Sequence, residues 1–323
     1  MKFSILGLAL TALAQLSMAA PGPHAIVKRA SSTEAANAGY ATLGGGTTGG
    51  AAASSVTTVT TLAALTAAAA GDTPAIIHIS GTITGNAVVS VGSNKSILGK
   101  SSSAALVGIG LRVNGESNVI IRNLKISKVL ADTGDAIGIQ DSNNVWVDHC
   151  ELFSDMDHDK DYYDGLLDIT HGCDYITVSY CYLHDHWKAS LVGHSDSNSA
   201  EDSGHLTVTY KHNYWSNLNS RTPSFRFGTG DIVNNYFVNC NDGINTRQGA
   251  QLLVRYNVFE DVDSPLYSTD SGYAYAVGND FGGASNEALT GTLTTMPYSL
   301  SPGGTSTLKA YVIANAGNIL TFG

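Results

Sequence analysis

The sequence predicts an all-β protein: a right-handed, single-stranded parallel β-helix with a short helix capping its N-terminal end. Three observations predict this fold. Only 14% of the 323 residues are charged and 35 are glycine, a composition typical of β-structure with many turns. Short β-branched runs that end at a fixed polar position recur along the chain. The recurring units are too short to contain a helix between consecutive strands.

The repeat is a column of asparagine and cysteine residues, each of which follows a β-branched run. The column consists of Asn123, Cys150, Cys181, Asn213, Asn235, Asn257 and Asn279. Its last three intervals are each 22 residues long, and the earlier ones are longer. Each interval is predicted to be one coil of a solenoid, with strands that pair in parallel with the next coil at ~4.8 Å. A βαβ arrangement would need helices of about 10 residues or more between the strands.

The column residues are expected to stack along the solenoid axis. Asparagine amides both donate and accept hydrogen bonds, so they can satisfy one another and the turn backbone beside them. Cys150 and Cys181 hold the column position on adjacent coils, where either a disulfide or a stacked pair of thiols would fit. Together with Cys173 and Cys240 they allow three disulfide pairings, and their spacing does not choose among these.

The N-terminal segment precedes the solenoid. Lys2 is followed by an apolar run at 3–16, which predicts a signal peptide at 1–19 and a secreted, extracellular protein. Residues 20–29 end in Lys28-Arg29 and are predicted to be a short propeptide, with a polar linker as the alternative. The β-helix domain is then 30–323, with no membrane anchor.

Several further segments can be assigned along the domain. Asn94 begins a glycosylation sequon, which predicts a glycoprotein. The segment 61–70 is predicted to be a helix that covers the first coil. The longer intervals place protruding loops at about 151–163 and 194–204, and residues after about 285 are expected to wrap the solenoid as an extended tail.

Three aspartates are predicted to converge on one edge of the solenoid. Counted back from the column, Asp135 lies on one coil and Asp164 and Asp168 on the next, and the last two should share one face of a strand. Carboxylates so close repel one another unless a cation joins them, and hard oxygen ligands suit Ca²⁺. The alternative is that these acids are dispersed over the surface.

The other acidic and histidine-rich segments are given structural interpretations. Asp155–Asp161 fails as an EF-hand because Lys160 stands where glycine is required, so it is predicted to be a solvated acidic loop. His184, His186 and His194 lack a pattern that favours zinc. The strand that carries Trp146, Asp148 and His149 is part of the framework, which predicts a buried structural cluster.

The basic residues are few, with 17 Lys and Arg against 27 Asp and Glu. This balance disfavours nucleic-acid binding. Lys188 and Arg221 follow the column by seven and eight residues on successive coils, so they should project together beside the acids. Arg226 and Arg247 add to this cluster, which suits a polyanion bound with Ca²⁺. The alternative is that these cations pair with aspartates to stabilise strand edges.

With these residues and motifs, the sequence resembles the secreted fungal form of the pectate lyases, polysaccharide lyase family 1. The Arg-x-Pro-x-x-Arg element at 221–226 is the most specific match. The glycine-rich segment 44–50 and the other matching segments follow the family's order along the whole mature chain. The matching segments are GDAI (134–137), VWVDH (145–149), DGLLDI (164–169), WK (187–188), LVG (191–193) and RTPSFR (221–226).

The resemblance implies calcium-dependent endo-cleavage of α-1,4-polygalacturonate (pectate) by β-elimination, giving 4,5-unsaturated oligogalacturonides. It implies that Asp135, Asp164 and Asp168 are the Ca²⁺ ligands. Arg221 would abstract the proton, and Lys188 would hold the substrate carboxylate. Because arginine is ordinarily protonated, we expect an alkaline pH optimum.

The resemblance also implies that Arg226 and Arg247 bind the substrate, the polygalacturonate of the plant cell wall. Some family members have a further acid where this chain has Thr133, which predicts weaker calcium binding or a water molecule in that place. We expect a monomer with no nucleic-acid or membrane partner. The competing interpretations are a pectin lyase acting on methylated pectin, a polygalacturonase, and a non-catalytic pectin-binding β-helix.

Overall fold

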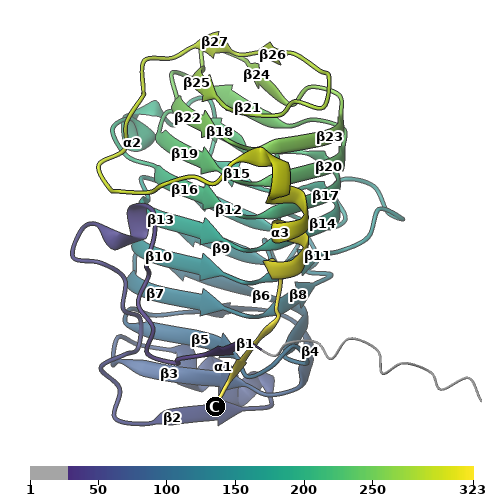
Figure 1. Ribbon diagram of the computed structural model, residues 1–323. Helices are drawn as coiled ribbons and strands as arrows, with labels where there is room; N and C mark the ends of the chain where they lie inside the picture. Colours follow the sequence, from purple (N-terminus) through teal and green to yellow (C-terminus); the bar gives the residue numbers. More distant parts are fainter. Residues whose placement is uncertain (1–27) are drawn as a thin grey trace, which may run out of the picture.

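The computed structural model describes residues 28–323, and the predicted signal peptide and most of the predicted propeptide lie outside these residues. The chain winds into a parallel β-solenoid (Figure 1). Its named strand pairs, from β1 to β28, all run parallel. This confirms the predicted parallel β-helix. Within residues 28–323 no helix has the length and apolar character needed to cross a bilayer.

Two long sheets form the walls of the solenoid. The first has 11 strands, taken in order from the N-terminal coil. They are β2 (Val56–Val59), β3 (Ala75–Ile79), β5 (Lys95–Gly99), β7 (Ser117–Arg122), β10 (Asn143–Asp148), β13 (Asp174–Ser179), β16 (Thr207–Lys211), β19 (Thr229–Val233), β22 (Gln251–Arg255), β25 (Tyr273–Val277) and β27 (Leu289–Thr290).

The second sheet has 15 strands in two limbs, which meet at the long strand β6 (Ala105–Asn114). The start of β6 pairs with β8 and its end pairs with β9, and β4 (Thr82–Ser90) also pairs with β6. The β8 limb consists of β8 (Lys125–Ser127), β11 (Glu151–Phe153), β14 (Tyr182–Lys188), β17 (Tyr214–Ser220), β20 (Tyr236–Cys240) and β23 (Val258–Val262). The β9 limb consists of β9 (Ile137–Gln140), β12 (Leu167–Thr170), β15 (Leu191–Val192), β18 (Ser224–Arg226), β21 (Ile244–Arg247), β24 (Leu266–Ser268) and β26 (Asn286–Glu287).

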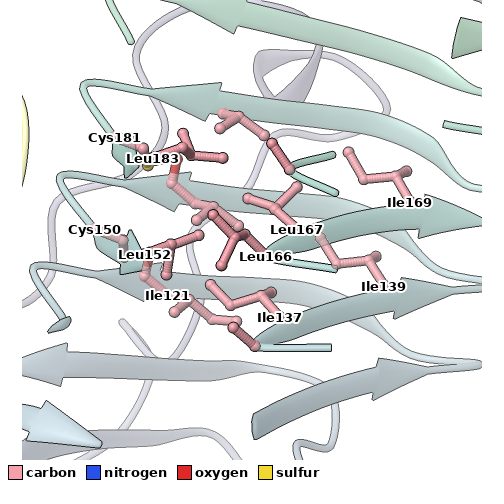
Figure 2. Close-up of a cluster of buried hydrophobic side chains, with 14 of the residues drawn as sticks. Ile121, Ile137, Ile139, Cys150, Leu152, Leu166, Leu167, Ile169, Cys181 and Leu183 are labelled. Atoms are coloured by element: carbon pink, nitrogen blue, oxygen red, sulfur yellow. Dashed lines mark hydrogen bonds between the residues drawn. The ribbon is translucent and has the colours of Figure 1, made fainter. Parts of the chain in front are cut away.

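The core is built from equivalent side chains stacked from coil to coil. Figure 2 shows Ile139 beside Ile169, and Leu152 beside Leu183, each pair on adjacent coils. Further along, aromatic rings continue the stack, with Phe237 and Phe259 at 4.5 Å between centroids. Parallel register repeats each environment at every coil, so one pattern of inward residues fills the whole interior.

The asparagine column forms the predicted ladder. The backbone N–H and the Nδ2 of Asn213 both donate to Asn235 Oδ1, at 2.9 and 3.0 Å. The same pair of bonds joins Asn235 to Asn257 and Asn257 to Asn279. Each amide thus satisfies a buried backbone N–H that no neighbouring strand reaches.

Within residues 28–323 the cysteines form no disulfide, and two of them, Cys150 and Cys181, are stacked thiols. All four cysteines are free and buried, and Cys150 and Cys181 lie one above the other in Figure 2. Burial, reinforced by the neighbouring Cys150 thiol, raises the pKa of Cys181 well above its ordinary value. Of the two arrangements considered for this pair, the structure has the thiol pair.

The helices lie outside the coils. Helix α1 (Leu62–Ala69) begins after Thr61, whose Oγ1 accepts a hydrogen bond from the N–H of Ala64, and its Leu65 is buried in the core. This confirms the predicted capping helix. Helix α2 (Ser199–Asp202) lies in the second predicted loop. The remaining short elements are the 3-10 turns η1 (Tyr40–Thr42) and η2 (Thr305–Thr307) and helix α3 (Leu308–Asn315).

The tail differs in part from its prediction. It wraps the solenoid, but it contains helix α3, which packs on the β8 limb against Tyr236 and Val258. The chain then returns along the solenoid (Figure 1), and β28 (Leu320–Phe322) pairs with β1 (Lys28–Ala30). The tail therefore fastens to the opposite end of the described chain.

Candidate active site

The candidate site lies at the edge of the solenoid where the chain passes from strands of the β8 limb to strands of the β9 limb. Lys188 ends β14, Arg221 lies between β17 and β18, and Asp168 is the second residue of β12. Lys188 is paired with Ser220, the residue before Arg221, on the next coil. Because equivalent positions on successive coils lie one above another, this edge gathers side chains that are far apart in sequence.

Asp135 and Asp168 approach each other over Gly165. Asp135 Oδ1 accepts a hydrogen bond from the N–H of Gly165 and Asp168 Oδ1 from the N–H of Leu191, each at 3.0 Å. A Cβ on Gly165 would stand 2.5 Å from Asp168 Oδ1 and 2.9 Å from Asp135 Oδ1. Glycine at 165 therefore leaves the space in which the two carboxylates converge.

Both carboxylates have raised pKa values. Burial is the largest cause for each, and the charge of Asp168 adds to the effect at Asp135. The guanidinium of Arg221, with Nη1 3.9 Å from Asp168 Oδ2, opposes the rise in the pKa of Asp168. The charge of Lys188 also opposes this rise. Two converging carboxylates that these cations compensate only in part form a donor set that fits a hard cation.

Asp164 joins this site by a different route from the one predicted. It lies before β12 rather than on it, so the expected shared strand face does not exist. Its side chain faces Lys188, with Asp164 Oδ1 3.4 Å from Nζ, and its carbonyl oxygen lies 2.6 Å from His186 Nε2. Among residues 28–323 no three Asp, Glu, His or Cys side chains close around one point as a complete metal cage. Asp135 and Asp168 are thus assembled, and Asp164 stands beside them.

The two predicted catalytic cations flank the acids. Lys188 is largely buried, with Nζ 3.3 Å from Asp161 Oδ1, and Arg221 keeps 32% of its side chain exposed. Arg221 is held in place by its neighbour Thr222, a fully buried residue whose Oγ1 donates to the carbonyl oxygen of Gly243 at 2.8 Å. The structure therefore brings Lys188, Arg221 and the acids together as expected.

Arg226 and Arg247 are neighbours on adjacent strands. A loop carboxylate bridges them: Asp196 Oδ1 lies 2.5 Å from Arg226 Nε, and Asp196 Oδ2 lies 3.1 Å from Arg247 Nη2. Arg247 also pairs with Asp270 at 3.2 Å. These are the aspartate pairs of the alternative interpretation. Both arginines nevertheless line, together with Arg221, a hollow of about 230 Å³.

The acidic loop is solvated as predicted at residues 157–161, which are exposed, and it is held at its start by Asp155. Asp155 pairs with Lys128 and with His158 and accepts a hydrogen bond from Tyr163. Burial works against ionisation, but the bond from His158 and the other donors outweigh it and lower the pKa of Asp155 to about 2. The loop is therefore anchored at Asp155, and its exposed Asp161 reaches Lys188.

The remaining sequence candidates have structural roles. Asp148 is buried and bonded to Arg122, to His149 and to Ser179, which confirms the predicted structural cluster. Thr133 donates to Asn86 Oδ1 at 2.7 Å, away from the acids. Asp161 and Asp196 were missed as site residues, because both lie on loops whose contacts no repeat spacing specifies.

The solenoid and its row of charged residues define a β-helix protein with a site suited to an extended anionic chain. A sequence model of the pectate lyase family matches residues 9–319. Pectate lyase A of Aspergillus niger is 61% identical over 254 residues, which is 78% of this chain and 79% of that protein. Pectate lyase A of Emericella nidulans is 62% identical over 253 residues, covering 78% and 77%.

The solved structures agree with the sequences. The pectate lyase Bsp165PelA from Bacillus sp. N165, solved in complex with trigalacturonate, has a TM-score of 0.80 and 33% identity, covering 88% of this chain and 99% of that one. The chain therefore belongs to the pectate lyase family, and it is a polysaccharide lyase enzyme.

Proposed function

We propose that this enzyme cleaves α-1,4-polygalacturonate internally by calcium-dependent β-elimination, leaving 4,5-unsaturated oligogalacturonides. The observation that carries the proposal is the placement of Arg221 beside the converging carboxylates of Asp135 and Asp168, with Lys188 on the adjacent coil. Membership of the pectate lyase family and the trigalacturonate bound to Bsp165PelA support it.

The reaction needs a base beside a neutralised carboxylate. In its neutral form, Arg221 accepts the C5 proton of a uronate, the electron pair of the broken C5–H bond forms the C4=C5 double bond, and the C4–O bond breaks. The leaving oxygen keeps its electron pair and takes a proton from water. Asp135, Asp164 and Asp168 would hold Ca²⁺, which supplies neutralisation of the uronate charge as it develops.

Lys188 and the arginines complete the site. Lys188 contributes a largely buried positive charge next to Asp164, where it stabilises the anion formed after proton loss. Arg226 and Arg247 bind carboxylates further along the substrate chain, in the hollow they share with Arg221. A pectin lyase acting on methylated pectin is the second candidate. A methyl ester carries no negative charge, however, so a cation held by the converging carboxylates would have no substrate anion to bind.

The first experiment follows the ultraviolet absorbance of unsaturated uronide during action on polygalacturonate. We expect a rise that a chelator abolishes and Ca²⁺ restores. An equal rise with chelator present, seen mainly on methylated pectin, would replace the proposal with pectin lyase. No rise on either polymer would leave a non-catalytic pectin-binding protein.

The variant Arg221→Lys tests the base. We expect it to fold with the circular dichroism and thermal midpoint of the native enzyme and to lose nearly all turnover, because lysine cannot place the same nitrogen at the C5 proton. Retention of substantial turnover by a folded variant would remove Arg221 from this role.

We also propose that the protein is secreted as a monomer and processed after Arg29, with Asn94 glycosylated. Secretion is supported by the predicted signal peptide and by the family. Asn94 Nδ2 donates to the carbonyl oxygen of Asp72, and glycosylation leaves one N–H on Nδ2 that can keep this bond. N-terminal sequencing, intact mass and light scattering of the secreted protein check all four points.

A further inference from the structure

A second polar hollow lies on the β9-limb side of the solenoid, towards its N-terminal end, and takes no part in the proposed reaction. It has a volume of about 410 Å³ and lies between the end of α1 and the outer face of β4 and β6. Ser90, Arg112, Asn114 and Glu116 line its polar side. We call it the N-terminal hollow.

Strand register places Arg112 in the same outward-facing row as the candidate site. Arg112 is paired with Gly138 on the next coil, and Gly138 is paired with Asp168 on the coil after that. At ~4.8 Å per coil, Arg112 stands about 10 Å along the axis from Asp168. The residues on either side of Arg112, Leu111 and Val113, are fully buried in the core, so the arginine side chain projects outward.

Glycine keeps the path between Arg112 and the acids open. Gly138 has no side chain, and a Cβ at that position would stand 3.2 Å from Asp135 Oδ2. A Cβ on Gly134 would stand 3.2 Å from Arg112 Nη2. Gly134 and Gly138 therefore place no side chain between the guanidinium of Arg112 and the carboxylate of Asp135.

Arg112 has no carboxylate partner. Of the arginines in residues 28–323, all except Arg29 and Arg112 have a carboxylate oxygen within 4.0 Å. Glu116 shares the hollow but accepts a hydrogen bond from Ser93 Oγ at 2.5 Å. A guanidinium that is partly shielded from water and unpaired is suited to a bidentate bond with an incoming carboxylate.

We propose that Arg112 and the N-terminal hollow form a distal subsite that binds a uronate carboxylate of the polygalacturonate chain, two coils from Asp168. Ser90 and Asn114, both exposed at the rim, face the sugar hydroxyls. This inference rests on the proposed function. Arg226 and Arg247 lie on the other side of the candidate site. The distal subsite would therefore give the substrate chain an arginine contact on each side of that site.

The test compares Arg112→Gln with the native enzyme on galacturonate oligomers of increasing length and on the polymer. We expect kcat/KM to fall about tenfold or more on the polymer and on long oligomers, the loss of one charge-assisted hydrogen-bonded contact, and to stay unchanged on short oligomers that do not reach Arg112. Arg112→Lys should restore part of the loss on long chains. Lys125→Gln, which removes a cation from the β8 limb, should show no dependence on length.

Two results would overturn the inference. An equal loss at every length would place Arg112 in support of the acids at the reaction centre, and no loss at any length would leave the hollow without substrate. If the native enzyme releases no unsaturated product from any oligomer, the proposed function fails. Calorimetric binding of long and short oligomers to the native protein and to Arg112→Gln then still decides whether the subsite exists.

Discussion

His212 is a partly buried histidine that the fold keeps neutral. The tyrosine rings of Tyr180 and Tyr311 pack against it, at 4.9 and 5.1 Å between centroids. Burial, with a smaller contribution from the charge of Lys211, lowers the pKa of His212 to about 3. Between pH 3 and 6.5 the unfolded chain therefore binds a proton here that the folded protein does not, so folding stability falls as the pH falls through this window.

The variant His212→Phe keeps a ring between the tyrosines and removes the titration. For the native protein, His212 should contribute a loss of up to about 1.4 kcal/mol of unfolding free energy per pH unit below 6.5. We expect the variant to show a shallower decline in urea unfolding at pH 4.5, 5.5 and 7. Identical slopes for the two proteins would show that His212 does not set the acid response.

Asp196 places a negative charge on the two arginines, Arg226 and Arg247, that line the hollow proposed to receive a polyanion. About half of its side chain is exposed, and it neutralises Arg226 and Arg247. We expect Asp196→Asn to lower KM for polygalacturonate by about two- to tenfold at low ionic strength, because removal of a like charge strengthens attraction of the polymer. The effect should shrink at high salt. A raised KM would mean that Asp196 orients the arginines rather than competing with the substrate.

Among the structural elements, the asparagine ladder is a chain of buried side-chain hydrogen bonds. Asn235 is fully buried: its Oδ1 accepts two hydrogen bonds from Asn213, and its Nδ2 donates to Tyr210, Val233 and Asn257. Asn279 ends the ladder and donates only to Val254. Removal of the side chain at the interior position, Asn235, therefore breaks more hydrogen bonds than removal at the terminal position, Asn279.

The pair Asn235→Ala and Asn279→Ala tests this difference. We expect the first to cost about 3 kcal/mol of unfolding free energy, since it strands several buried polar groups, and the second to cost clearly less. Urea unfolding of both variants measures the two values. Equal costs would show that the ladder's bonds are replaced by water.

The repeat made the elements predictable, and its limits explain what was missed. Asn213, Asn235 and Asn257 share one environment at each coil, so their spacing alone predicts both the coil and the ladder. Asp196 and helix α3 belong to segments that contact the outside of the solenoid, where no period operates. Asp164 was predicted to lie on a strand with Asp168, but β12 begins at Leu167, three residues after Asp164, although the coil of Asp164 was assigned correctly.

At the scale of the whole molecule, the C-terminal tail packs along the β8 limb through helix α3, and we call this packed segment the strap. Val312 of α3 is fully buried against that limb, whereas its neighbour Ile313 is 48% exposed. We expect Val312→Ala to cost about 2 kcal/mol of unfolding free energy and Ile313→Ala less than about 0.5 kcal/mol. Chemical unfolding of the two variants provides the comparison, and similar small costs would mean that the strap does not support the solenoid.

The pairing of β1 with β28 makes the order of events matter for the proposed cleavage after Arg29. Lys28 and Arg29 are paired with Leu320 and Thr321, and proteases cut exposed, unpaired segments far more readily than paired strands. A chain in which β28 docks first shields the dibasic pair and keeps its two described ends fastened together. A chain that is cut first loses two of the three residues of β1, and β28 is left as an open edge that can accept a strand from another molecule.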